Sequence, residues 1–320
     1  MMCQLFESMF SFKELKISRR ALLHFLLELS SHYHPNPFHN FQHACTVTHV
    51  LFKLFEDTNA FEYVSKLQLF ATMIAAVGND SFALQPILLN CYVEGHDTDH
   101  PGNTNLFEIN SESELALVYN DISVLENHHA AQLFRILRKK DINIFADMSP
   151  PDFKDAKKTI IHCILGTDMT KHFGQVAETE AKAASGWELP RYTGVGMTED
   201  SLYYCKLMVH AADLSNAVRP FEIAKYWGYK IAEEFNAQVE KEEKLGLPVL
   251  NFMIARNNKQ ICENEIGFST NVVAPMWHAI VKLFPTLDHL VQQMQDNYSQ
   301  WRELLDQNIV KPTKKAIKLL

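Results

Sequence analysis

The chain has 320 residues, of which 47% are hydrophobic and 21% are charged, as in an ordinary globular protein with one large core. Its formal net charge of -8 argues against the broadly basic face that binding to nucleic acid requires. No apolar run is long enough for a membrane span. The six cysteines are scattered without a Cys-x-x-Cys pair, and the N-terminus does not resemble a signal peptide. We therefore expect a cytoplasmic protein with reduced thiols.

Apolar residues recur at helical spacing along the whole chain, and we find no convincing alternating strand. Two start signals are clear: Ser149 stands before two prolines, and Thr198 precedes an apolar run that ends at Asp213. The pattern predicts an all-α fold, with residues 1–320 as a single domain. The predicted helices span residues 11–31, 41–55, 64–77, 112–119, 122–138, 149–182, 198–213, 220–246, 264–282 and 285–305.

The densest group of metal-binding side chains is the stretch His96-Asp97-Thr98-Asp99-His100. A carboxylate has two oxygens, so Asp97 could bridge two cations. Two metals about 3.5–4 Å apart are the usual machinery for phosphoester hydrolysis. The alternative for these five residues is a histidine-rich surface turn or a helix cap.

Three further polar features could belong to the same site. His39 and His43 lie one helical turn apart at the start of a predicted helix, which suits two histidines in one cleft. Taken alone, they are more often capping or core histidines. The run from Glu126 to His129 interrupts an apolar helix; either it supports metal ligands from behind or it forms a solvated face. Asp213 follows a buried run, where a carboxylate is costly unless it is paired or metal-bound.

Taken in order, these motifs resemble the catalytic domain of class I cyclic-nucleotide phosphodiesterases, over roughly residues 30–305. The sequence motifs loosely resemble most the high-affinity cGMP-type branch. The resemblance implies a compact multi-helix catalytic domain of the HD type that hydrolyses cGMP, cAMP or both in cyclic-nucleotide signalling. It rests on Phe38-His39-Asn40-x-x-His43-Ala44, His96-Asp97-x-Asp99-His100-Pro101-Gly102, Tyr119-Asn120-Asp121, Leu125-Glu126-Asn127-His128-His129, Thr167-Asp168-Met169 and Ala212-Asp213-Leu214-Ser215-Asn216.

The resemblance also implies a role for each site residue. The expected ligands of a first metal, usually zinc, are His43, His96, Asp97 and Asp213. Asp97 would bridge to a second metal, Mg2+ or Mn2+, and a hydroxide between the metals would attack phosphorus. His39 would be the general acid for the leaving 3′-oxygen, with Glu126 orienting it. The residues expected behind the ligands are His100, His129 and Asp168.

The implied substrate pocket is formed by apolar residues and one carboxylate. Phe268 would stack on one face of the purine and Ile231 would press on the other. Without the resemblance, Ile231 and Phe235 would be interpreted as ordinary core residues at helical spacing. The full set expected to bind substrate is Phe38, Met169, Leu214, Asn216, Ile231, Phe235, Glu265 and Phe268.

The sequence departs from the family pattern in three places. Residues 79–95 resemble an insertion placed directly before His96. Glu265 stands where the family has a purine-reading glutamine, and a carboxylate can only accept hydrogen bonds. Thr46 and Ala255 replace common aspartates.

Three hypotheses remain open. The first is a working phosphodiesterase, with a homodimer possible. The second is a catalytically impaired relative that binds a nucleotide or a partner. The third, more distant, is another two-metal phosphohydrolase.

Overall fold

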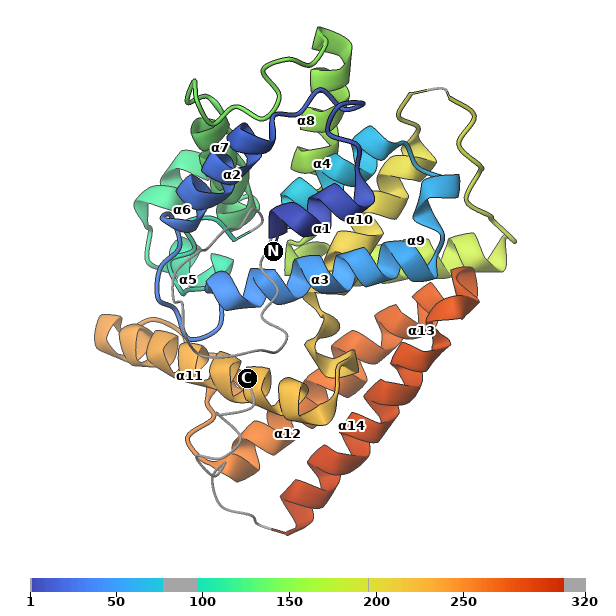
Figure 1. The fold of residues 1–320 in the computed structure, drawn as a ribbon. Helices are drawn as coiled ribbons and strands as arrows, with labels where there is room; N and C mark the ends of the chain where they lie inside the picture. Colours follow the sequence, from blue (N-terminus) through green and yellow to red (C-terminus); the bar gives the residue numbers. More distant parts are fainter. Residues whose placement is uncertain (1, 77–96, 195, 308–320) are drawn as a thin grey trace.

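The computed structural model describes residues 2–76, 97–194 and 196–307 (Figure 1). These residues form helices and connecting turns, with no strand among them, which confirms the predicted all-α fold. The α-helices are α1 (Met2–Met9), α2 (Arg19–Ser30), α3 (Phe41–Asp57), α4 (Lys66–Ala76), α5 (Asn105–Asn110), α6 (Glu114–Tyr119), α7 (Val124–Leu137), α8 (Pro150–Gly166), α9 (His172–Ala184), α10 (Glu199–Asp213), α11 (Phe221–Leu245), α12 (Asn258–Phe268), α13 (Ala274–Leu283) and α14 (Asp288–Asp306). Short 3-10 turns are η1 (Ala60–Glu62), η2 (Met169–Lys171), η3 (Ser215–Val218), η4 (Asn251–Met253) and η6 (Pro285–Leu287), and η5 (Ser269–Val273) is a π-helical turn.

Local capping explains where several helices begin and end. The Ser149 side chain caps α8, and Thr198 and Ser201 form a reciprocal capping box at the start of α10, as expected from the sequence. The single helix predicted over 149–182 is in fact two, because Asp168 caps a new turn by accepting from the Thr170 N–H. The helix predicted over 11–31 is shorter: Ser18 is its N-cap, so it begins at Arg19.

Helix α10 lies at the centre of the molecule and packs against α3, α4 and α8. The apolar run that the sequence shows in α10 is buried from Leu202 to Ala212 except for Lys206. A smaller apolar cluster around Trp301 joins α11, α12 and α14. The large core thus fixes the end of α10, from which Asp213 projects, against the start of α3.

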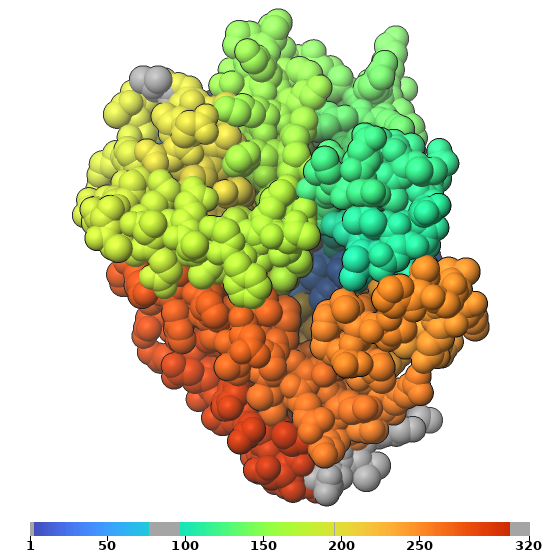
Figure 2. Space-filling model, turned by 180° about the vertical axis from the view of Figure 1, so that it is seen from behind, coloured from blue at the N-terminus to red at the C-terminus, as the bar shows by residue number. Residues whose placement is uncertain are grey.

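The last four helices lie below α3 in Figure 1, and α13 packs against α9. The space-filling view from behind shows a hollow where α5 to α7, α9 and the α11–α12 region meet, with blue atoms of the N-terminal part at its floor (Figure 2). Glu126 on α7, Ile231 and Phe235 on α11, and Glu265 and Phe268 on α12 belong to the elements around this hollow.

Candidate active site

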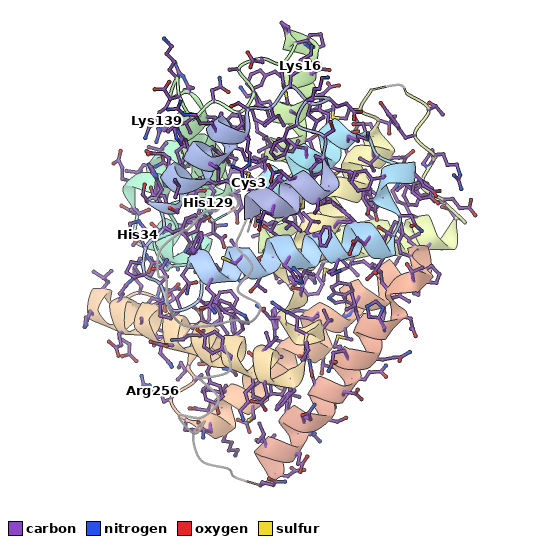
Figure 3. The ribbon with its side chains drawn as sticks, in the orientation of Figure 1. Cys3, Lys16, His34, His129, Lys139 and Arg256 are labelled. Atoms are coloured by element: carbon purple, nitrogen blue, oxygen red, sulfur yellow. The ribbon has the colours of Figure 1, made fainter. Side chains whose placement is uncertain are left out.

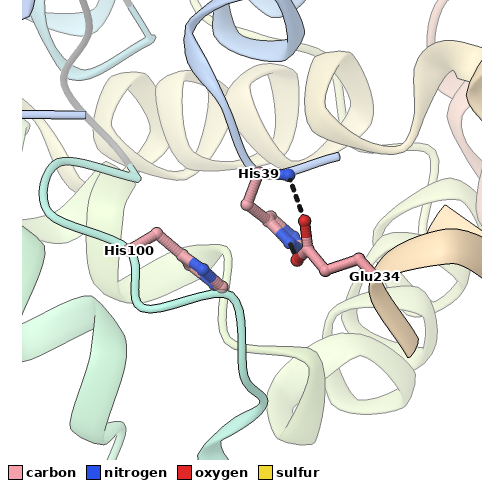
Figure 4. A group of neighbouring side chains, drawn as sticks. All are labelled: His39, His100 and Glu234. Carbon is pink, nitrogen blue, oxygen red and sulfur yellow. Dashed lines mark hydrogen bonds and ion pairs between the residues drawn. The ribbon is translucent and has the colours of Figure 1, made fainter. Parts of the chain in front are cut away.

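His39 and Glu234 form an ion pair between the start of α3 and the middle of α11 (Figure 4). The Nδ1 atom of His39 bonds to one carboxylate oxygen of Glu234. The other oxygen accepts from the backbone N–H groups of Phe38 and His39, at 2.8 and 2.9 Å. Glu234 is 3% exposed, so the helix presents a nearly buried carboxylate whose contacts all lie on this one loop. The pair therefore fixes both the backbone and the ring of His39.

The two partners shift each other's pKa values in opposite directions. Burial by itself would lower the pKa of His39, but the charge of Glu234, with smaller contributions from Asp97 and Asp213, raises it to about 9. Burial would raise the pKa of Glu234, but the His39 ring and the two backbone N–H groups lower it to about 2. At neutral pH His39 is therefore a protonated imidazolium held by a carboxylate.

His100 stacks on the ring of His39, with centroids 4.1 Å apart and planes 13° from parallel. The Gly102 N–H donates to Nδ1 of His100 at 3.0 Å, so a neutral His100 carries its proton on Nε2. Possible ligand atoms of His39, His100 and Glu234 lie within 4.8 Å of one another, so these residues could hold a metal ion. In His39 the Nδ1–H group donates to Glu234 and the raised pKa keeps Nε2 protonated, so this ring suits an acid better than a metal ligand. In His100 the lone pair of Nδ1 already accepts from the Gly102 N–H.

A second group of polar side chains converges around His43, next to His39. The Nε2 atom of His43 is 3.0 Å from a carboxylate oxygen of Asp213 and 3.7 Å from one of Asp97. The two rings of His39 and His43 are 5.8 Å apart between centroids, so the two histidines lie side by side. His96, the fourth expected ligand, lies outside the described residues. The grouping brings an imidazole and two carboxylates together from α3, α10 and the turn at residues 97–100.

Asp99 fastens this turn to the neighbouring elements. Its backbone N–H donates to the His32 carbonyl at 3.0 Å. Its two carboxylate oxygens bond to Nε2 of His34 and Nε2 of His128, each at 2.8 Å. His34 and His129 are labelled in Figure 3, on the side of the molecule where α3 begins. Sequence reasoning gave Asp99 no role of its own, although its place in the motif was noted.

The residues expected behind the ligands make different contacts from one another. Nδ1 of His129 bonds to the Thr98 carbonyl at 2.7 Å, and its ring stacks on His100, so His129 packs directly against the turn. Asp168 accepts from the Ser123 hydroxyl at 2.6 Å and from Thr170, and so holds α7 to η2. Asp168 is thus a cap at this edge of the site.

The expected role of Glu126 requires a correction. Its carboxylate oxygens accept from the Asn105 side chain at 3.1 and 3.0 Å, and the bond to the His39 ring is made by Glu234. Asn105 opens α5 and also accepts from the Leu125 N–H, which directs Glu126 toward α5. Burial, foremost, raises the pKa of Glu126 to about 7. No sequence signal separates Glu234 from Glu233 beside it, because both fit a helix with buried and exposed polar faces.

The expected base-binding residues lie mainly on α11 and α12. A Cβ atom added to Gly228 would lie 2.8 Å from the carboxyl carbon of Glu265, so that carboxyl group packs directly on the backbone of α11. Ile231 and Phe235 follow Gly228 at helical spacing, and Phe268 is 39% exposed at the end of α12. The structure therefore brings Glu265 and the α11 positions to one helix–helix contact, where burial raises the pKa of Glu265 to about 7.

The other expected contacts with substrate are spread around the cleft. The Phe38 ring packs on His43 at 4.5 Å and on Trp227 at 5.4 Å between centroids. Leu214 follows Asp213 and packs partly on the core, and Asn216 lies in η3. Met169 is exposed in η2. Their part in binding stays a prediction.

Comparison with known proteins gives a consistent result. The family model described as 3′5′-cyclic nucleotide phosphodiesterase matches residues 38–81 and 87–294. The chain is 33% identical to the "Probable 3′,5′-cyclic-AMP phosphodiesterase pde-4" of Caenorhabditis elegans, over 89% of this chain and 40% of that protein. It is 32% identical to the mouse "High affinity cGMP-specific 3′,5′-cyclic phosphodiesterase 9A", over 92% of this chain and 51% of that protein. It thus spans about half or less of these relatives.

Solved structures agree with the sequence relatives. The phosphodiesterase domain of the RhoPDE fusion protein from the choanoflagellate Salpingoeca rosetta superimposes with a TM-score of 0.85 at 34% identity, covering 96% of this chain and 90% of that one. The structure of LmjPDEB1 in complex with IBMX gives a TM-score of 0.82 at 26% identity, over 96% and 85% of the two chains. Among the described helices, none is long and apolar enough to cross a membrane.

Proposed function

Because the chain belongs to the 3′,5′-cyclic nucleotide phosphodiesterase family, we propose that it hydrolyses 3′,5′-cyclic nucleotides to 5′-nucleoside monophosphates. The observation that carries the proposal is a half-buried proton donor next to a group of side chains suited to a metal ion: the His39–Glu234 ion pair lies beside the convergence of His43, Asp97 and Asp213. The homodimer and the cytoplasmic location expected from the sequence stay predictions.

The donor set around His43 fits a divalent cation. Two carboxylates close to one imidazole repel each other, and a cation between them offsets that repulsion. Imidazole and carboxylate suit Zn2+ at a first site, held by His43, His96, Asp97 and Asp213. The second oxygen of Asp97 suits Mg2+ or Mn2+ at a second site. When bound, the metals would supply an activated water and would neutralise charge on the phosphoryl oxygens.

His39 has the chemistry of a general acid. Its Nδ1 is held by Glu234, so Nε2 is the nitrogen that delivers a proton to the leaving 3′-oxygen. Its raised pKa keeps it protonated at neutral pH before the reaction. Glu234 stabilises the imidazolium and fixes the ring, while His100 supports the opposite face by stacking. The chain thus places a proton donor next to the group that would hold the phosphate.

The test is hydrolysis of cAMP and of cGMP by the full chain, with Mg2+ or Mn2+ and with a chelator. We expect turnover that the chelator abolishes. Asp97→Ala and Asp213→Ala should each lose turnover and bound metal while retaining helical circular dichroism. Asp147→Ala, an exposed aspartate with the same change of charge, serves as the control and should keep both. Full occupancy of two metal sites in either ligand variant would contradict this assignment.

One observation favours a second candidate, a relative that binds nucleotide but turns it over poorly. Glu265 occupies the position where the family has glutamine, and the carboxyl group lies in the predicted base pocket. Such a protein would bind both metals and a cyclic nucleotide yet release little monophosphate. Calorimetric binding measured together with the hydrolysis assay separates the two candidates.

A further inference from the structure

The helix that carries Glu265 and Phe268 does not end at Phe268 but continues into α13 through the π-helical turn η5. The sequence explains the turn: Pro275 has no N–H, so it cannot bond to the Asn271 carbonyl as an α-helical residue would. The Ala274 N–H bonds instead to the Ser269 carbonyl, five residues back. Such turns are rare and concentrate at functional sites.

The register of this turn decides where the base-binding residues point. One extra residue in a turn rotates all that precedes it by roughly 100° about the helix axis, since an α-helix has 3.6 residues per turn. Without η5, Glu265 would therefore leave the face of α12 that meets α11 at Gly228, and Phe268, three residues later on the same helix, would turn with it. The orientation of the base-pocket side chains therefore depends on the contacts that hold η5 in its π-helical form.

A buried histidine pair reaches this turn from the other side. His172, the first residue of α9, places its Nε2 atom 3.1 Å from the Val272 carbonyl in η5. Its Nδ1 atom is 2.9 Å from Nε2 of His210 in α10. Both histidines are 0% exposed. A carbonyl only accepts, so Nε2 of His172 must carry the proton, Nδ1 must accept, and His210 must donate to it. One arrangement of protons satisfies both bonds, with both rings neutral.

We propose that His172 is a positioning residue for the base pocket: its bond to the Val272 carbonyl holds η5 in the register that directs Glu265 and Phe268 toward α11. The inference rests on the proposed function, because it concerns binding of the nucleotide base. His210 fixes the tautomer of His172 and ties it to α10, the helix that ends at Asp213. The pair thus links the helix of a candidate metal ligand to the helix of the base pocket.

Two conservative variants separate the two bonds of His172. In His172→Gln the side-chain nitrogen lies as far along the chain as Nε2 and can still donate to the Val272 carbonyl. In His172→Asn the side-chain oxygen replaces Nδ1 and can still accept from His210, but the bond to η5 is lost. His172→Leu removes both bonds. His278→Leu, an exposed histidine of α13, is the control.

We expect His172→Leu and His172→Asn to raise the KM for cAMP and cGMP about tenfold, the worth of one buried hydrogen bond, with kcat and metal content nearly unchanged. His172→Gln and His278→Leu should keep the KM of the original protein. Equal KM values in the Gln and Asn variants would overturn the proposal, as would a loss of kcat and metal with KM unchanged.

Binding measurements separate this inference from the proposed function. If the unsubstituted chain hydrolyses neither cyclic nucleotide, the proposed function fails, and the affinities of the same variants for 5′-AMP, 5′-GMP and inorganic phosphate still test His172. His172→Leu should then weaken both nucleotides but not phosphate, which does not reach the base pocket. Equal weakening of all three, or no nucleotide binding by the unsubstituted chain, would overturn the inference.

Discussion

Replacing Glu265 by glutamine tests the base pocket most directly. The Glu265 carboxyl group packs on the backbone at Gly228, and glutamine has the same shape, so the packing is kept. Burial raises the pKa of Glu265 to about 7, so near neutral pH the group exists in two forms. The neutral acid can both donate and accept, as an amide does, whereas the carboxylate only accepts. Glu265→Gln removes this titration and leaves a donor at every pH.

The size of the effect follows from one hydrogen bond. A purine-edge bond that cannot form leaves a buried polar group unpaired, at a cost of about 1–3 kcal/mol. That corresponds to roughly 5- to 150-fold in KM, since each 1.4 kcal/mol is tenfold. Below pH 7 the acid form predominates and the two proteins should have similar KM values. Above pH 7 the KM of the glutamate protein should rise above that of Glu265→Gln, with kcat little changed, because base contacts contribute mainly uniform binding.

The assay is steady-state kinetics on cAMP and cGMP from pH 6 to pH 8.5. The ratio of KM values cancels the titration of groups that both proteins share. Glu263→Gln, an exposed change of the same kind on α12, controls for net charge. A KM ratio that stays constant with pH, or unchanged KM values for both substrates, would show that Glu265 does not read the base.

Three further predictions concern His39, its partner Glu234 and the buried His210. His39→Ala should lower the rate by roughly 100- to 10,000-fold with metal content intact, and by less for a substrate with a better leaving group; Glu234→Gln should move the alkaline limit of the pH–rate profile to lower pH, and an unmoved limit would count against the pair. Burial lowers the pKa of His210 to about 4, so the unfolded chain takes up a proton first and the free energy of unfolding should fall by about 3 kcal/mol between pH 6.5 and pH 4. In urea titrations of His210→Leu, the free energy of unfolding should depend less on pH over that range. An equal pH dependence in both proteins would show that His210 is not its cause.

Local signals predicted the fold well because helical periodicity and capping are local. The starts of α8 and α10 follow from Ser149 and Thr198 alone. The π-helical turn was not predicted: Pro275 indicates an irregularity, but its form depends on the contact with His172 from a distant helix. A contact between residues far apart in the sequence leaves no local sequence pattern by which it could be predicted.

Features of the site with a local sequence pattern were likewise predicted, and those that depend on distant packing were not. The spacing of His39 and His43 predicted one cleft, and the rings do lie together. The cost of burying Asp213 predicted a partner, and His43 lies 3.0 Å away. Their action as ligands stays a prediction. The partner of His39 was assigned wrongly, because Glu126 and Glu234 are both buried carboxylates on helices and only the packing of α11 shows which one reaches the ring.

Contacts within the described part of the chain hold the turn that carries Asp97. Asn36 donates from its side chain to the His100 carbonyl at 2.8 Å, and Asp99 is bonded on three sides by elements on either side of the turn. Gly102 allows the close approach, since a Cβ there would lie 2.9 Å from the Asn36 side-chain oxygen, and its positive φ of 72° suits glycine. A turn fixed by this many partners keeps one geometry. The contacts of the described residues therefore hold Asp97 in position beside His43, and the Asp97→Ala variant tests its proposed part in metal binding.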